Sequence, residues 1–452
     1  MKNYNLTQGN VKKLLLLFAL PYLAANLLQA LYGATDLFVV GRYNTPSAIS
    51  AVNIGSQIMQ IITSFVIGCS MGCTVMIGKY IGEKEDRRSA KVLGCTILLF
   101  AVFTIVITPI MIGLAPYIVK LMQTPSEALS EATTYVAICA IGIPFITIFN
   151  VTAAILRGMG DSKTPMIIVA VACVINVGGD FLLTGLLKMG VLGVAIATSS
   201  AQLISSLIGI IFVIKHKFPF TFEKKDLRPN KEESKNIIKV GLPIALQDTL
   251  INISFIILTV IANLRSLTSS SAVGVVEKLI LFMFLVPTSM LSAISAFTAQ
   301  NIGAQMPERA ASATKFGMLI TAIFGGIMCA LSWICPQILT GIFSKDAQVI
   351  TEANEYLKTY SIDCILVAIT FCINGYLCGQ GKSSIAFLHN VISIFLIRIP
   401  SAYLLSKAFP TTMLPMGLAS PLGSVASIII LSVYYLIVNR RKSKKQERLE
   451  NN

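Results

Sequence analysis

Charged residues are scarce in this chain. Asp, Glu, Lys and Arg make up 13% of its 452 residues, whereas 55% of the residues are hydrophobic and the mean hydropathy is +0.76. Soluble domains carry about 25% charged residues, and a chain with so few cannot cover its apolar side chains with a polar surface. The composition therefore excludes an ordinary soluble protein and predicts a polytopic membrane protein.

Signatures of catalysis and of metal binding are also missing. None of the ten cysteines forms a Cys-x-x-Cys pair, and most lie in hydrophobic runs, so we expect them to be buried apolar side chains. The two histidines, His216 and His389, form no His-Glu-x-x-His motif. The segment 157–163 resembles a phosphate loop but lacks the Gly-Lys-Ser/Thr spacing, and we interpret it as a turn. The sequence thus predicts neither an enzyme nor an ATP-driven pump, and no cofactor.

Long apolar runs dominate the chain, and each run is long enough to cross a bilayer as a helix. Breaks at charged residues or at Pro and Gly separate about twelve such runs. The fold class that follows is an all-α polytopic membrane protein. The predicted spans are 11–40, 46–78, 90–119, 129–156, 163–187, 190–214, 236–263, 270–302, 311–341, 351–378, 383–406 and 415–438.

Basic residues are distributed unevenly between the two sides of the membrane. If the spans alternate in direction, 27 of the 36 Lys and Arg residues face one side and seven face the other, while Lys278 and Arg398 lie within spans. Cytoplasmic segments are the basic ones, so both termini are predicted to be cytoplasmic. The net charge of +15 then reflects topology, and we expect no nucleic-acid partner.

The sequence also repeats itself at an offset of about 221 residues. Leu156-Arg-Gly-Met-Gly160 matches Leu377-Cys-Gly-Gln-Gly381. The repeat contains six spans, an even number, so both halves enter the membrane in the same direction. This predicts two six-helix lobes related by a pseudo-two-fold axis along the membrane normal, with a cavity between them. The predicted boundaries are an N-terminal lobe at 1–218, a cytoplasmic linker at 219–235, and a C-terminal lobe with a basic tail at 236–452.

The first span carries an acid, Asp36, well inside its apolar run. A carboxylate there costs roughly 2.5–3.5 kcal/mol on insertion scales, and it usually faces protein or water. Gln29, Tyr32 and Asp36 fall on one helix stripe, which predicts a polar lining for a substrate cavity. Pro21 removes one backbone hydrogen bond and is the predicted hinge. The alternative is an ordinary kinked helix in which a neighbouring group caps Asp36.

A second polar pair, Asn176 and Asp180, lies four residues apart on the fifth span and therefore shares one helix face. No Lys, Arg or His lies deep enough in the first six spans to neutralise Asp36 or Asp180. A proton or a cation is therefore expected to bind there. The alternative is a structural pair in which Asn176 donates a hydrogen bond to Asp180.

The second half of the chain has a different set of intramembrane charges. They are Glu277, Lys278, Asp363 and Arg398. Two acids and two bases can neutralise one another, so we predict a buried charge network in which Arg398 pairs with Asp363 or Glu277. Direct participation of Asp363 or Glu277 in ion coupling is the alternative.

Several segments together resemble the multidrug and toxic compound extrusion (MATE) transporters, and most closely their DinF-like branch. The segments are LYGATDLFVVGR, GKYIGEKEDRRSAK, ILRGMGDSKTPM, INVGGDFLLTG, MGVLGVAIATSSAQ and AFTAQNIGAQMPERAA, and the resemblance spans the whole chain. It implies alternating access and efflux of amphipathic, often cationic drug-like compounds in exchange for protons or sodium. It also implies a monomer in the plasma membrane of a prokaryote. For the site, it adds Asp36 and Thr198 to Asn176 and Asp180 as the ligands of a proton or of sodium.

Two other functions remain open from the sequence. A flippase of lipid-linked precursors belongs to a related transporter class, but that class usually has more spans and a cationic cavity. A membrane enzyme or scaffold is the third possibility, although the chain offers no nucleophile, metal set or cofactor motif for it.

Overall fold

The computed structural model describes residues 5–215 and 218–450, with side chains as far as residue 437. The described chain is almost entirely helical and contains no β-strand. The first half runs α1 (Val11–Tyr43), α2 (Pro46–Glu83), α3 (Asp86–Leu121), α4 (Ser126–Ile141), α5 (Ile143–Gly158), α6 (Lys163–Asp180), η1 (Phe181–Leu186) and α7 (Gly190–Lys215). A short 3-10 helix, η2 (Lys224–Leu227), then leads to the second half.

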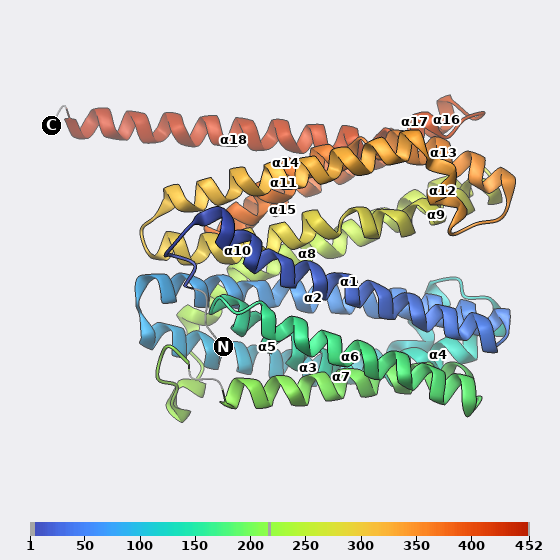
Figure 1. Ribbon diagram of the computed structural model, residues 1–452, viewed down its shortest axis with the longest axis horizontal. Helices are drawn as coiled ribbons and strands as arrows, with labels where there is room; N and C mark the ends of the chain where they lie inside the picture. The colour runs from blue at the N-terminus through green and yellow to red at the C-terminus, as the bar shows by residue number, and fades with distance from the viewer. Residues whose placement is uncertain (1–4, 216–217, 451–452) are drawn as a thin grey trace. The chain divides into compact units, whose positions relative to one another are not determined.

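The second half begins with α8 (Lys231–Asn263), α9 (Leu267–Met283), α10 (Leu285–Gly303) and α11 (Pro307–Ile334). It continues with α12 (Pro336–Gly341), α13 (Ala347–Tyr360), α14 (Asp363–Gly379) and α15 (Ser383–Ile392). It ends with η3 (Ser393–Arg398), α16 (Ile399–Ala408), α17 (Leu414–Gly417) and α18 (Ala419–Glu450). Figure 1 shows the helices in chain order.

The twelve predicted spans are confirmed in number. Among the described residues, nine helices are long and apolar enough to cross a membrane, and the count reaches twelve when each of three bent helix pairs is one span. Polar backbone groups need internal hydrogen bonds in lipid, and helices supply them within each span. The chain is therefore an all-α polytopic membrane protein.

Three spans that the sequence predicts as continuous helices are broken instead. They are 129–156, 270–302 and 351–378, which bend by 46°, 42° and 47° between α4 and α5, α9 and α10, and α13 and α14. Pro144 and Pro287 lie in the first turns after two of these breaks. Proline has no backbone N–H, so it lacks one helical hydrogen bond and favours a bend or break at the preceding turn. For the same reason α11 ends at Ile334, before Pro336, rather than continuing to the predicted residue 341.

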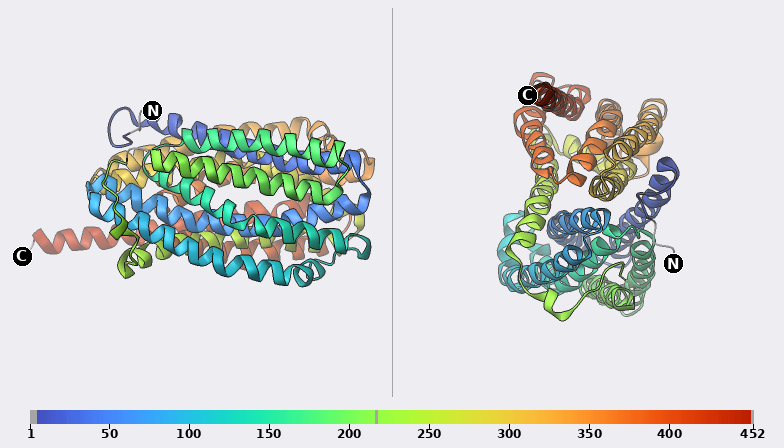
Figure 2. Two further views of the ribbon diagram at one scale, coloured as in Figure 1. Left: turned by 90° about the horizontal axis from the view of Figure 1, so that it is seen from below. Right: turned by 90° about the vertical axis from the view of Figure 1, so that its left-hand side faces the viewer.

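The described chain forms two compact units. Unit 1 contains Met1–Thr249, Leu291–Thr314 and Gly375–Ser383, and unit 2 contains Leu250–Met290, Lys315–Asn374 and Ser384–Asn452. Unit 1 therefore gathers the first half of the chain together with parts of α8, α10, α11 and α14. Helices α1–α7 of unit 1 run along a common direction, as the end-on view in Figure 2 shows. The predicted lobe boundaries at 218 and 236 remain predictions.

Small residues allow the helices of unit 1 to pack closely. The ring of Tyr135 on α4 covers Gly55 on α2, and the hydroxyl of Tyr135 lies 3.1 Å from Ser56 Oγ. Helix α6 approaches α7 where Gly179 faces Ala197, at 3.0 Å from the position a Cβ would take. This close approach places the end of α6 directly beside the middle of α7.

Ion pairs with buried acids attach the predicted linker to α3. Arg87 forms an ion pair with Asp226 at 2.9 Å, and Arg88 forms one with Glu233 at 2.9 Å. The hydroxyl of Tyr80 also donates to Glu233 at 2.8 Å, and Glu233 is only 2% exposed. Buried charges are retained in proteins when they are paired and hydrogen-bonded, so these contacts order the connection between α7 and α8.

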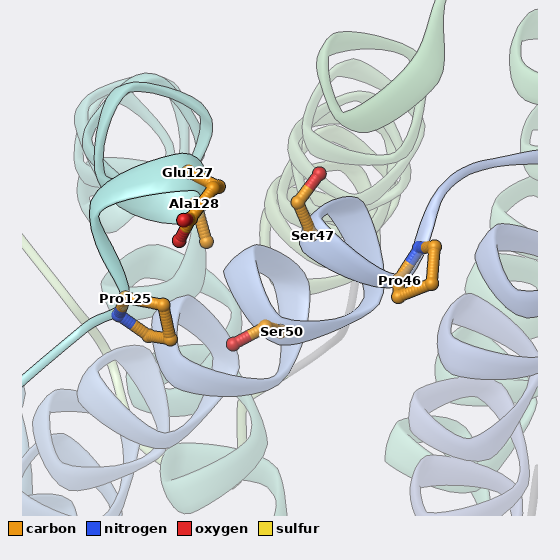
Figure 3. Close-up of a pocket in the computed structure, with 6 residues that line it drawn as sticks. All are labelled: Pro46, Ser47, Ser50, Pro125, Glu127 and Ala128. Carbon is orange, nitrogen blue, oxygen red and sulfur yellow. The ribbon is translucent and has the colours of Figure 1, made fainter.

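A small pocket of about 310 Å³ lies between the start of α2 and the start of α4 (Figure 3). It is lined by Pro46, Ser47, Ser50, Pro125, Glu127 and Ala128. None of the site residues predicted from the sequence lines this pocket.

Candidate functional site

A chain of side-chain hydrogen bonds joins three helices of unit 1. The amide of Asn176 on α6 donates to Thr198 Oγ1 on α7 at 3.2 Å. The hydroxyl of Thr198 in turn donates to Asp36 Oδ2 on α1 at 3.3 Å. Asp180 lies one turn beyond Asn176, and its carboxyl group interacts with that of Asp36. The structure thus brings together all four residues of the predicted coupling site.

The site has more oxygen atoms than hydrogen-bond donors. Asp36, Asn176 and Asp180 are 4%, 2% and 0% exposed. Asp36 Oδ1, Asn176 Oδ1 and both carboxyl oxygens of Asp180 are buried and have no hydrogen-bond partner. Buried polar atoms are nearly always satisfied, and an exception needs an explanation such as an ion or a proton.

The two structural alternatives were a capped Asp36 and a hydrogen bond from Asn176 to Asp180, and they account for only part of this arrangement. Thr198 does cap one oxygen of Asp36, but the other oxygen is unsatisfied. Asn176 donates to Thr198, so its amide does not neutralise Asp180. The residues fit a proton, or a hard cation such as sodium with oxygen ligands. In the described part of the chain, no group of three or more His, Cys, Asp or Glu residues could hold a metal ion.

The backbone is irregular immediately after the site. A π-helical turn, η1, begins at Phe181, directly after Asp180. Such turns often occur at functional sites, because the wider helix redirects the side chains around it. A second π-helical turn, η3, ends at Arg398 in unit 2. Neither turn was predicted from the sequence.

The polar stripe of α1 is half-buried at Gln29 and Tyr32. Tyr32 interacts with Asp36 and with the side chain of Gln202 on α7. Gln202 was not predicted from the sequence, although it lies four residues after Thr198 and therefore on the same face of its helix. The role of Gln29 and Tyr32 in a substrate cavity remains a prediction.

Pro21 is buried within α1, as a hinge residue would be. The next residue, Tyr22, lies under the guanidinium group of Arg157, which is 4.2 Å from the centre of its ring. This cation–π contact attaches the part of α1 beside Pro21 to the end of α5.

The predicted pairing of Arg398 with an acid is wrong in its direct form. In the described part of the chain, Arg398 makes no ion pair within 4.0 Å. Its guanidinium group donates to Ser254 Oγ at 3.2 Å and to the hydroxyl of Tyr360 at 3.4 Å. Asp363 and Glu277 interact with the charge of Arg398 only electrostatically, over a longer distance than an ion pair. Neutral hydroxyl groups thus stand where the sequence predicted carboxylates.

The other members of the predicted network are also separated. Asp363 accepts a hydrogen bond from Ser420 at 2.8 Å, and Glu277 accepts one from Thr259 at 2.9 Å. Lys278 is exposed, so it does not belong to the cluster. Adjacent residues on a helix point in different directions, which is why Glu277 is partly buried and Lys278 is not.

Comparison with known proteins identifies the family. The MatE family model matches two segments of the chain, residues 21–182 and 243–404. The chain belongs to the MatE family. The two matches also confirm the internal repeat, and the predicted resemblance to multidrug and toxic compound extrusion transporters is confirmed with them. Membership of the DinF-like branch remains a prediction.

Relatives match over almost the whole MatE chain. The probable multidrug resistance protein YpnP of Bacillus subtilis is 28% identical, and the match covers 90% of this chain and 91% of the relative. The probable multidrug resistance protein NorM of Thermotoga maritima is 27% identical, with 94% and 92% covered. A solved structure described as the outward-facing conformation of a multidrug resistance MATE family transporter has a TM-score of 0.91 and 20% identity, covering 98% of this chain and 99% of that one.

Proposed function

We propose that this MatE protein is a secondary-active antiporter that exports amphipathic, often cationic drug-like molecules in exchange for protons or sodium. The observation that carries the proposal is the set of buried, unsatisfied oxygens on Asp36, Asn176 and Asp180. The names of YpnP and NorM, which are probable multidrug resistance proteins, support the substrate class. No cofactor is required, because the ion gradient supplies the energy.

The coupling ion acts by changing the charge of the site. With both carboxylates ionised, Asp36 and Asp180 repel each other in a buried environment, and a proton or a sodium ion removes that repulsion. In this proposal, Thr198 and the side-chain oxygen of Asn176 orient the ion or the protonated acid, and the hydrogen bonds from Asn176 to Thr198 and from Thr198 to Asp36 support that role. Neutralisation then favours a different arrangement of α1 relative to α6 and α7.

Pro21 gives α1 a place to bend when the site changes charge. Its missing N–H leaves one turn of α1 without a backbone hydrogen bond, so bending there is less costly than elsewhere. Bending moves Gln29 and Tyr32 with Asp36, shrinks the substrate cavity and releases the drug. The ion and the drug thereby bind preferentially to different conformations of the protein. This difference couples ion entry to drug export by alternating access.

A flippase of lipid-linked precursors is less well supported. An anionic pyrophosphate group needs cations in its binding cavity. At the site itself, the unsatisfied atoms of Asp36, Asn176 and Asp180 are carboxyl oxygens and an amide oxygen, which bind cations instead.

Gradient-driven flux in proteoliposomes tests the proposal. We expect purified protein to move ethidium, a lipophilic cation, when an inward proton or sodium gradient is imposed, and to stop when an ionophore dissipates that gradient. Separate proton and sodium gradients identify the coupling ion. Ethidium flux that is indifferent to both gradients would rule out antiport.

We also propose that the protein lies in the plasma membrane as a monomer with both termini in the cytoplasm. The uneven distribution of Lys and Arg supports this orientation. An impermeant lysine reagent applied to intact cells is expected to modify Lys188, in the short connection before α7, and to spare Lys224 and Lys225 in η2. Modification of η2 in intact cells would reverse the orientation.

A further inference from the structure

A short segment before the first helix is firmly attached to unit 1. We call residues 5–9 the strap. Leu6 in the strap is fully buried, although terminal segments are exposed unless contacts hold them. Its N–H donates to Gln300 Oε1 at 3.3 Å, and its carbonyl accepts from Asn301 Nδ2 at 3.1 Å. Gln300 and Asn301 belong to α10, in the second half of the chain.

Arg309, in the first turn of α11, donates to the strap with two nitrogens of its guanidinium group and to Asn301 with the third. Nη1 donates to the carbonyl of Gly9 at 3.0 Å, and Nη2 donates to the carbonyl of Leu6 at 3.4 Å. Nε donates to Asn301 Oδ1 at 3.1 Å, which orients the amide that also holds Leu6. Gly9 has a φ of 90°, a conformation that glycine adopts without strain and that lets the chain turn from the strap into α1.

The strap reaches a place where helices from the two halves of the sequence pack closely together. Gly82 near the end of α2 leaves no room for a side chain, because the carbonyl of Gln300 occupies the space. In the same way, Gly303 on α10 packs against the carbonyl of Lys79 on α2. The amide of Gln300 also donates to the carbonyl of Gly158 at the end of α5, at 2.9 Å. We call this contact of α2 and α5 with α10 the seam.

We propose that the strap is a latch that keeps the seam closed, and that Gln300, Asn301 and Arg309 are positioning residues that hold it. The strap is covalently joined to α1 and hydrogen-bonded to α10 and α11, so the seam cannot separate without moving or releasing it. Because individual hydrogen bonds contribute modestly to stability, the latch can open reversibly in each transport cycle. This inference rests on the proposed alternating access, in which the strap end of the protein opens to the cytoplasm.

The latch can be weakened from two independent directions. Arg309→Ala removes the three donated hydrogen bonds, and Gly9→Ala strains the turn while the side chain of Arg309 is kept. Glu308→Ala is the matched control, because Glu308 is the exposed neighbour of Arg309. Native Cys69 on α2 reports on a second contact between the two halves of the sequence, that of α2 with α8, where its backbone carbonyl lies against Gly241.

The experiment measures hydrogen exchange of residues 5–10 and the rate at which N-ethylmaleimide labels Cys69, both by mass spectrometry. In both latch variants we expect faster exchange in the strap and labelling of Cys69 that rises on the order of tenfold, because several hydrogen bonds no longer favour the closed state. Glu308→Ala is expected to match the parent protein. Faster exchange in the strap with unchanged labelling of Cys69 would make the strap a local anchor and overturn the proposal.

Transport kinetics give a readout that a purely structural role does not change. A larger open population lowers the apparent KM for ethidium at the strap side several-fold in Arg309→Ala, since more molecules are competent to bind. A lower maximal rate with the parental KM would contradict the latch. If the parent protein shows no gradient-driven ethidium flux while the labelling of Cys69 still rises in the variants, the latch is upheld and the antiport proposal fails.

Discussion

Asp36→Asn and Asp180→Asn are expected to fold like the parent protein and to lose gradient-driven transport. Each change replaces a carboxyl group with an amide of nearly the same shape, so the packing of α1, α6 and α7 is preserved. The new amide at position 180 can donate to Asp36 Oδ1 or Asn176 Oδ1, which now lack hydrogen-bond donors. Neither amide can take up or release a proton, and a neutral amide binds sodium more weakly than a carboxylate does.

The measurement is the initial rate of ethidium flux in proteoliposomes under the gradient that drives the parent protein. We expect the rate in both variants to fall to that of liposomes without protein. Glu127→Gln is the matched control, because Glu127 is an exposed carboxylate of the same unit and is expected to be dispensable. Parental rates in both site variants would make this cluster structural and move the coupling to Asp363 or Glu277.

Arg398→Ala is expected to have the largest effect on stability. The side chain is 8% exposed, donates to Ser254 and Tyr360, and lies 4.6 Å from the centre of the Phe255 ring. Its removal takes away the donor that the hydroxyl groups of Ser254 and Tyr360 accept from, and it leaves Asp363 and Glu277 without a nearby cation. Hydrogen bonds that involve a charged group contribute about 1.5–3 kcal/mol each, and two of them are lost with Arg398.

Thermal unfolding of the detergent-solubilised protein measures this cost. We expect a lower midpoint for Arg398→Ala, while Lys278→Ala remains within the error of the parent protein. Lys278 is a suitable control, because it is a cation of the same unit that is exposed rather than buried. An equally stable Arg398→Ala protein would mean that water or another group replaces the guanidinium.

The separation of Arg398 from the acids also bears on mechanism. In unit 1, no ion pair to Asp36 or Asp180 is present among the described residues, and in the proposed mechanism a mobile ion neutralises them. In unit 2, a resident arginine sits among hydroxyl groups near Asp363 and Glu277, so part of the compensation is built in. This difference favours unit 1 as the place where the driving ion binds.

The sequence by itself determined the membrane fold and most of the candidate site. Length and hydropathy of the apolar runs suffice for about twelve spans, because the bilayer requires each span to be a long apolar helix. The repeat and the motifs were sufficient to predict the family. The i, i+4 spacing of Asn176 and Asp180 placed them together, since it depends only on helix geometry.

Only the tertiary structure decided which side chains from distant parts of the chain meet. Thr198 bridges Asn176 and Asp36 because α6 and α7 approach closely at Gly179, and spacing along the sequence contains no such information. Arg398 takes hydroxyl partners rather than acids for the same reason, since charge content alone does not say which groups a helix face presents. The contacts of the strap were not predicted from the sequence either. Its contacts join residues about 300 positions apart, and only the packing of α10 and α11 against the start of the chain creates them.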